Sequence, residues 1–509
     1  MKKLHKNLFM LLIIIVFFNI ILYIYSDTIE DFAPQHIGIA IKTINPKIDL
    51  PTYESDFNSI PGFYVFLGEL MLICNIPYNS IPTAPIMLLP YAFVFFGFVY
   101  VFTKRNIYLS VLLSFFTLNN GVKGTFKIFI WPHGMGEILY FTILLLICLA
   151  FSDKIKWQYN LLITISVLTL PFLSYNITFN LFLLFIMFLF IDNRYMIKSF
   201  FGSTINQQIL IFAILLVIIE LGLISFVYNS FIPKVIHIDI LETSVEGFYK
   251  FFKYFTGQSI SEEIIIKELL ISVPAILTLI YVIKYIIILF ITLLSLKVVY
   301  NKELHKGLYT QFTRRLFNSF LYTSILYSIA RLFIGQFYIT EIFYPFIAGV
   351  IILCKENGQR KVKKFLYTAL LILIIINFSV TLISHQNKLV QKDEYSYIRL
   401  SADWTSRYIA SSVNFPDQLT YGWFLVQFAH LNSSFSGLFL KNDDILALYT
   451  EDEVSSGKFI VVNYRLNMNS VRSWTALKSF SLFRDKIETN PSVQGIIYAL
   501  NEDITIIIT

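Results

Sequence analysis

The chain has 509 residues, of which 56% are hydrophobic and only 14% are charged, and it contains 51 phenylalanines and 31 tyrosines. A single water-soluble domain of this length would expose too much apolar surface to stay dispersed, which excludes that class. The net charge of +7 fits the basic cytoplasmic loops of a polytopic membrane protein and does not point to a nucleic-acid partner. The three cysteines have no short spacing between them, so a Cys-ligated metal site is not expected.

The first segment predicts the orientation of the chain. Lys2, Lys3 and Lys6 precede the apolar stretch Leu8–Tyr25. This stretch is long enough to span a bilayer, and no small-residue cleavage site follows it. We therefore expect a retained transmembrane helix whose N-terminus is cytoplasmic.

Further apolar segments follow, and the loops between them alternate in charge as the positive-inside rule requires. Lysines and arginines concentrate in loops that this orientation places inside, such as 297–315 and 355–364. The segments predict about eleven transmembrane helices, which places both the 26–85 loop and the 385–509 tail outside the cell. After the first helix, the expected spans lie near 86–103, 106–118, 135–151, 158–171, 174–192, 205–232, 266–297, 316–334, 342–354 and 365–384.

The tail differs from the rest of the chain. Residues 401–412 have helical spacing, Lys458–Leu466 resembles a strand, and Gly495–Ile508 predicts a hairpin that turns at Asn-Glu-Asp. The expected organisation is a multi-spanning membrane domain over residues 1–384 and a small extracytoplasmic α/β domain over residues 385–509.

Acidic residues gather in the outer loop, directly after the first predicted helix. Asp27, Glu30 and Asp31 precede Pro34, which can begin a short helix. In that helix Ile37, Ile41 and Ile44 would share one face, which suits a segment lying along the membrane surface. Carboxylates held there could deprotonate an acceptor hydroxyl or coordinate a divalent cation. The alternative is a solvated acidic loop that caps a helix.

A second apolar stretch of this loop follows Pro61-Gly62. It is too short to span a bilayer and predicts a re-entrant or interfacial helix. Two such helices in one outer loop are unusual for a transporter.

Several motifs, taken in order and by membrane side, resemble the GT-C class of integral membrane glycosyltransferases. The resemblance covers nearly the whole chain, although each motif is degenerate. Its parts are Asp31-x-x-x-Gln35-His36-x-x-x-Ala40, Asp56-x-x-x-x-Pro61-Gly62-Phe63-Tyr64, Trp131-Pro-His-Gly-Met-Gly-Glu137, the turn from Ala330 to Glu341, and the Asp403-Trp404 helix with the closing strand pair.

The resemblance implies that a sugar passes from a polyprenyl-phosphate donor to a glycan, lipid or protein acceptor on the outer face. It favours Asp31 as the catalytic carboxylate, with Glu30 as the next choice and Asp27 as the third. Many members have a compact Asp-x-Asp-like pair, for which Glu30-Asp31 is the nearest match here. Metal dependence varies within the class, so a divalent cation is compatible with the resemblance but not implied by it.

Four other residues are candidates for substrate binding. His36 could bind a phosphate or sugar, or serve only as a structural histidine. Asp56 could contact the acceptor or lie in a solvated loop. His133 and Glu137 are four residues apart at the expected start of a helix. They could therefore line a sugar pocket together, or Glu137 could simply favour the helix N-terminus.

Arg331 and Glu341 flank a predicted outer turn. A guanidinium suits the phosphate of a polyprenyl-phosphate sugar, because it offers paired donors and a permanent charge. The alternative is a structural ion pair between the two residues. A transporter or flippase, a polysaccharide polymerase or ligase, and a membrane protein that only displays its outer domain remain the rival functions.

Overall fold

The computed structural model is predominantly helical and contains one five-stranded sheet. It describes residues 33–44, 61–75, 87–103, 106–118, 132–152, 157–191, 204–219, 275–300, 311–333, 343–356, 360–386, 395–409, 413–415, 424, 426, 437–439, 459–463, 489, 493, 495–500 and 504–508.

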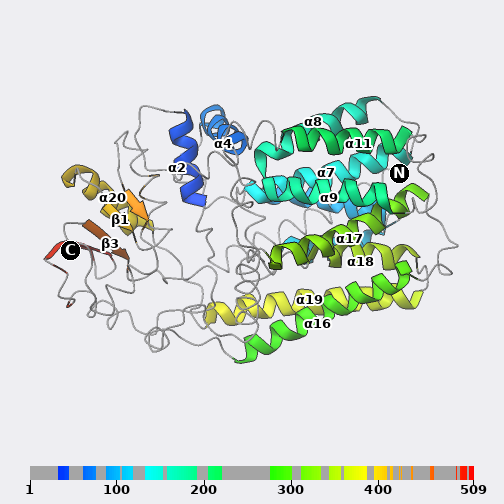
Figure 1. Ribbon diagram of the computed structural model, residues 1–509. Helices are drawn as coiled ribbons and strands as arrows, with labels where there is room; N and C mark the ends of the chain where they lie inside the picture. Colours follow the sequence, from blue (N-terminus) through cyan, green and yellow to red (C-terminus); the bar gives the residue numbers. More distant parts are fainter. Residues whose placement is uncertain are drawn as a thin grey trace.

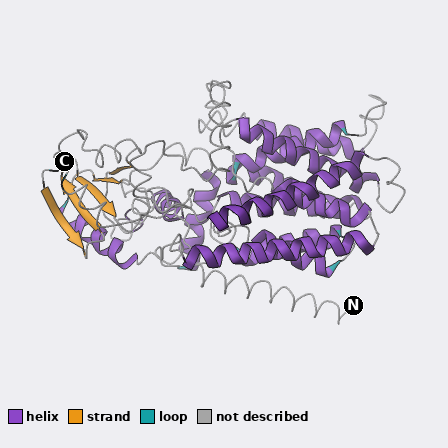
Figure 2. Ribbon diagram, turned by 90° about the horizontal axis from the view of Figure 1, so that it is seen from below, coloured by secondary structure: helices purple, strands orange, loops and turns teal. Residues whose placement is uncertain are grey.

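A bundle of mostly apolar helices forms the largest part of the described structure (Figure 1). Its members lie side by side along their lengths, and Figure 2 shows the same arrangement from below. They are α5 (Leu88–Phe102), α6 (Ile107–Leu118), α7 (Pro132–Ser152), α8 (Trp157–Leu173), α9 (Tyr175–Phe190), α11 (Thr204–Val217), α16 (Ala275–Tyr300), α17 (Gln311–Phe333), α18 (Phe343–Glu356) and α19 (Arg360–Gln386).

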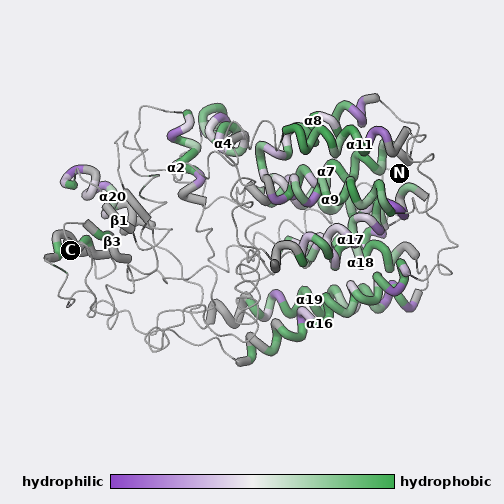
Figure 3. The backbone as a smooth tube through the Cα atoms, viewed as in Figure 1, coloured by the Kyte–Doolittle hydropathy of each residue, from purple (hydrophilic) through white to green (hydrophobic). Residues whose placement is uncertain are grey.

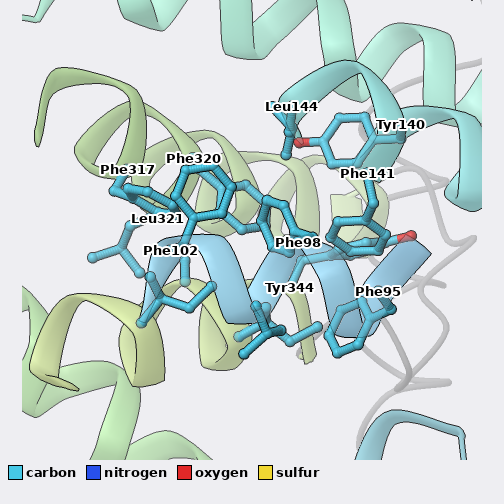
Figure 4. Packing of buried hydrophobic residues seen from close by; sticks show 14 of the residues in the cluster. Phe95, Phe98, Phe102, Tyr140, Phe141, Leu144, Phe317, Phe320, Leu321 and Tyr344 are labelled. Atoms are coloured by element: carbon cyan, nitrogen blue, oxygen red, sulfur yellow. The ribbon is translucent and has the colours of Figure 1, made fainter. Parts of the chain in front are cut away.

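Aromatic side chains fill the middle of the bundle. The rings of Phe95 and Phe98 in α5 each lie 5.0 Å from the ring of Phe141 in α7. Phe102 lies 4.6 Å from Phe317 in α17, edge to face. Figure 4 shows these residues packed as one cluster. Such offset and edge-on arrangements are favourable beyond the burial of area alone, so α5, α7 and α17 are held together by specific ring contacts.

The outside of the bundle is apolar as well. Along α16, Leu279, Ile286 and Phe290 are all more than half exposed, and α19 exposes Ile375 in the same way. Figure 3 shows hydrophobic residues over most of the length of both helices. Within the described residues, these two helices contain the stretches that are long and apolar enough to cross a membrane, and eight further apolar helices are shorter.

The helices agree with the expected spans but extend beyond some of them. α17 begins at Gln311 and α19 at Arg360, about five residues before the boundaries predicted from hydrophobicity. Both extensions carry basic side chains, which a hydrophobic window leaves out. The first expected span, Leu8–Tyr25, and parts of the spans 205–232 and 266–297 lie outside the described residues.

Two shorter helices, α2 (Ala33–Ile44) and α4 (Pro61–Cys74), confirm the two helices predicted in the 26–85 loop. They pack against each other, and α4 also packs against α8. Cys74 is exposed at the end of α4, whereas Cys148 and Cys354 are buried in the bundle.

The sheet has the strand order β2-β1-β3-β5-β4. Its strands are β1 (Val413–Phe415), β2 (Gly437–Phe439), β3 (Phe459–Asn463), β4 (Gly495–Leu500) and β5 (Ile504–Ile508). β1 pairs in parallel with β2 and β3, whereas β5 pairs antiparallel with β3 and β4. The predicted hairpin is therefore confirmed, and it is extended by three strands.

One helix accompanies the sheet. α20 (Tyr395–Tyr408) contacts β5 and buries Ala402 and Thr405. It confirms the helix predicted at 401–412, although it begins earlier and ends earlier. Figures 1 and 2 both place α20 and the strands beyond one end of the bundle, with α2 on the same side.

Candidate functional site at one end of the helical bundle

The α2–α4 pair is held together by a close approach at Gly68. A Cβ atom at this position would collide with the Ile44 side chain and would lie 3.2 Å from the carbonyl oxygen of Ala40. On α2, Ile37 and Ile41 are each only 1% exposed. Protein therefore covers this face, and the expected position of the segment along the membrane surface stays a prediction. The exposed apolar residues belong to α4 and include Leu72 and Ile73.

His36 lies inside this pair. Its Nδ1 is 2.9 Å from the Tyr64 hydroxyl, and its ring stands nearly edge-on to Phe63 at 5.6 Å between centroids. The side chain is 9% exposed. Because one ring nitrogen is engaged by Tyr64, the hydrogen bond fixes the orientation of the imidazole. The contact makes His36 a structural link between the two helices, and it leaves its proposed role in substrate binding untested.

The start of α4 is docked on the bundle. A Cβ atom at Gly62 would lie 2.6 Å from Cβ of Phe172, near the end of α8. Ser174, between α8 and α9, lies equally close to Gly136 near the start of α7. A Cβ atom added at Gly136 would lie 2.6 Å from Cβ of Ser174. These contacts connect α4 to the end of the bundle at which α5, α7, α9 and α18 begin. This end is called the site end below.

Glu137 lies at the site end, in the first turns of α7. The Tyr344 hydroxyl, from the start of α18, donates a hydrogen bond of 2.7 Å to Oε1 of Glu137. The Tyr91 hydroxyl, from the start of α5, also hydrogen-bonds to this carboxylate. Glu137 itself is only half-buried. Side chains from two neighbouring helices thus orient this carboxylate, whose Oε2 atom is buried. A carboxylate oxygen is a strong acceptor for a hydroxyl group.

A buried lysine lies next to this group. Lys284 of α16 is 1% exposed, and its Nζ is 5.3 Å from the centroid of the Phe343 ring. Phe343 and Tyr344 are consecutive, so the first turn of α18 contacts both Lys284 and Glu137. A cation over an aromatic face is attracted by the ring quadrupole. The site end therefore combines a carboxyl group held by tyrosines with a buried amine.

The remaining candidates are placed less completely. His133 is in the first turn of α7 and Arg331 in the last turn of α17, but the described part of the structure includes the backbone of both and not their side chains. Asp27, Glu30, Asp31, Asp56 and Glu341 lie outside the described residues. Asp31 precedes the start of α2 by two residues, and its catalytic role stays a prediction.

Within the described residues, no group of three His, Cys, Asp or Glu side chains could hold a metal ion. Comparison of the chain with protein-family models and with curated proteins found no match.

Sequence reasoning missed the tyrosines of the site. Tyr64, Tyr91 and Tyr344 stand in apolar segments, where a tyrosine usually signals packing. The available signal was their position, because each is within four residues of the start of a helix. A polar tip near a helix start at the membrane edge can reach groups presented by neighbouring helices.

Proposed function

We propose that the chain is a polytopic membrane glycosyltransferase of the GT-C type. It would transfer a sugar from a polyprenyl-phosphate donor to an acceptor on the outer face of the membrane. The helical bundle would span the bilayer, and the 385–509 region would lie outside the cell.

The observation that carries this proposal is the position of the α2–α4 pair. α4 docks on the site end, where Tyr91 and Tyr344 orient Glu137, and α2 packs against α4. α2 also begins two residues after Asp31. We infer that this position in the sequence brings Asp31, a carboxylate suited to act as a base, toward the end of the bundle where Glu137 can bind sugar hydroxyls, as a transfer reaction at the membrane surface requires.

The proposed chemistry is a displacement at the anomeric carbon of the sugar. The bond between this carbon and the donor phosphate oxygen breaks, and a bond to the acceptor oxygen forms. Asp31 takes the acceptor proton, and polyprenyl phosphate leaves with the bonding electron pair. Arg331 would stabilise the negative charge of the leaving phosphate. Glu137 would accept hydrogen bonds from the sugar and hold it in the reactive orientation.

The decisive experiment uses the purified full chain in liposomes that contain a radiolabelled polyprenyl-phosphate hexose or pentose. We expect release of polyprenyl phosphate together with a labelled glycosylated product when membrane extract from the native host supplies the acceptor. Glu137→Gln removes the charge while keeping the size of the side chain, and we expect it to lower transfer about 10-fold or more.

Glu69→Gln is the matched control, because Glu69 is an exposed glutamate on α4, and it should leave transfer unchanged. Movement of intact donor across the liposome membrane without cleavage would favour a flippase instead. Equal activity of Glu137→Gln and Glu69→Gln would remove Glu137 from the site.

A further inference from the structure

Several buried polar side chains of the bundle have no described hydrogen-bond partner, and three of these side chains lie on helices that contact one another. The three are Tyr140 of α7, Asn180 of α9 and Thr323 of α17, and each is 0% exposed. Among the described residues, nothing pairs with the hydroxyl groups of Tyr140 and Thr323, or with the oxygen and nitrogen of the Asn180 amide. Four buried polar atoms on three helices are therefore unpaired within the described part of the chain.

The packing of the helices places these side chains at a similar depth along the bundle axis. α9 and α17 run antiparallel, since Phe188 lies 5.4 Å from Phe312 and Phe179 lies 6.5 Å from Tyr327, between ring centroids. Asn180, next to Phe179, is consequently opposite the turn of α17 that contains Thr323.

Tyr140 faces the same part of α17. Its ring lies 6.1 Å from that of Phe320, and its hydroxyl interacts electrostatically with Tyr327. Thr323 stands between these two α17 residues in the sequence and, with them, on one helix face.

This cluster of Tyr140, Asn180 and Thr323 adjoins the site end. Tyr140 follows Glu137 by about one helical turn, and its ring lies 6.4 Å from that of Tyr344. The carboxylate and the three uncharged polar groups thus follow one another from the edge of the bundle inward.

Buried polar groups are almost always paired, because an unpaired donor or acceptor loses its hydration without compensation. A hydroxyl, a phenol and an amide together offer donors and acceptors but no charge. This combination matches a ligand with several hydroxyl groups. It does not match a phosphate, for which cationic groups are preferred.

We propose that Tyr140, Asn180 and Thr323 form the inner part of a sugar-binding site, which holds the hydroxyl groups of the donor sugar while Glu137 holds its outer edge. This inference deepens the proposed function and rests on it for the identity of the donor. The binding of a polyhydroxylated ring by the three side chains is nevertheless measurable without transfer.

The test compares two probes by equilibrium titration of the full chain in detergent. One is a short-chain polyprenyl-phosphate hexose, and the other is the same polyprenyl phosphate without its sugar. The ratio of the two dissociation constants measures the contribution of the sugar to binding affinity, called the sugar contribution below. We expect Asn180→Leu and Thr323→Val each to reduce this contribution about 3- to 10-fold, with unchanged affinity for polyprenyl phosphate. Thermal stability should stay the same or rise, since each change removes an unpaired buried group.

Ser114→Ala is the matched control. Ser114 is also 0% exposed, and its hydroxyl has no described partner, but it belongs to α6. This variant should leave the sugar contribution unchanged. An unchanged sugar contribution in both Asn180→Leu and Thr323→Val would overturn the inference and leave the cluster as a site for internal water.

A second measurement separates this inference from the proposed function. Saturation-transfer NMR with free glucose, galactose, mannose and arabinose should give a signal with the wild-type chain and a weaker one with the Asn180→Leu/Thr323→Val double variant. Binding of a free sugar without any binding of the lipid-linked donor would support the cluster and contradict the glycosyltransferase. No response to the free sugars or to the lipid-linked donor would contradict both.

Discussion

In the α2–α4 pair, the apolar side chains Ile37 and Ile41 of α2 are buried against a neighbouring helix. α16 and α19 also pack together, yet both expose large apolar side chains along their outer faces. An amphipathic helix can satisfy its apolar face with a protein partner, whereas a helix that is apolar all round needs an apolar environment on every side. The first pair therefore suits an interface, and the second suits the interior of a bilayer.

The largest expected effect concerns the segment that leads into α2. Asp31→Asn keeps the size of the side chain and removes its ability to take a proton. We expect sugar transfer to fall at least ~100-fold while membrane insertion stays normal. Transfer in liposomes and the amount of membrane-integrated protein are the measurements.

Asp403→Asn is the control for this change, since Asp403 lies on α20 and pairs with Arg407 at 2.8 Å. Full activity of Asp31→Asn would move the base to Glu30 or Asp27. Full activity of Asp31→Asn, Glu30→Gln and Asp27→Asn would contradict a catalytic role for this loop.

A smaller effect tests what surrounds the second pair. Ile286 on α16 is 59% exposed, and Ile496 on β4 is 47% exposed. If lipid covers α16, Ile286→Lys should cost about 2.5–3.5 kcal/mol in membrane insertion, whereas Ile496→Lys in a wet domain should change stability by less than about 0.5 kcal/mol. Membrane insertion of Ile286→Lys is measured as the amount of expressed full chain that resists carbonate extraction. The stability of Ile496→Lys is measured by thermal unfolding. Similar tolerance at both positions would contradict a lipid-facing α16.

The docking of the first pair is tested at its glycine. Gly68→Ala places a Cβ atom against Ile44 and near the Ala40 carbonyl, and we expect a loss of about 1–3 kcal/mol of stability. At Gly97 of α5 the nearest heavy atom to an added Cβ is 3.9 Å away. Gly97→Ala should therefore stabilise the helix by roughly 0.5–1 kcal/mol. Thermal unfolding of both variants measures the contrast, and changes of the same sign would show that α2 and α4 are not closely packed at Gly68.

The smallest effect concerns the hydrogen bond between α2 and α4. Tyr64→Phe removes the hydroxyl that lies 2.9 Å from Nδ1 of His36 and should lower stability by about 0.5–1.5 kcal/mol. Tyr108→Phe is the control, because Tyr108 is 74% exposed. Indistinguishable thermal unfolding of the two variants would mean that ring packing alone orients His36.

The regular elements with strong local patterns are predictable from sequence. The hairpin within Gly495–Ile508 has two apolar runs around a polar turn, and α4 follows Pro61-Gly62 directly. β1 and β2 are not predictable in this way. Each has only three residues, and their parallel pairing depends on partners far along the chain.

The candidate site is predictable only in part. Glu137 is identifiable because a carboxylate near an apolar helix is conspicuous. The hydrogen bonds from Tyr344 and Tyr91 depend on how α18 and α5 pack against α7. Local sequence patterns do not predict this packing. The same holds for Asn180 and Thr323, whose common level results from the antiparallel packing of α9 on α17. Long-range packing decides such contacts, and it can override what the sequence indicates locally.

The distribution of thiols gives the protein a built-in reporter position. The sequence contains three cysteines, and only Cys74 is exposed, at the end of α4, while Cys148 and Cys354 are each 4% exposed. A maleimide fluorophore should therefore attach mainly at Cys74 in the native chain, without prior removal of other cysteines. Its emission wavelength would report the polarity around α4, and its anisotropy would follow the motion of that helix as lipids or donors are added.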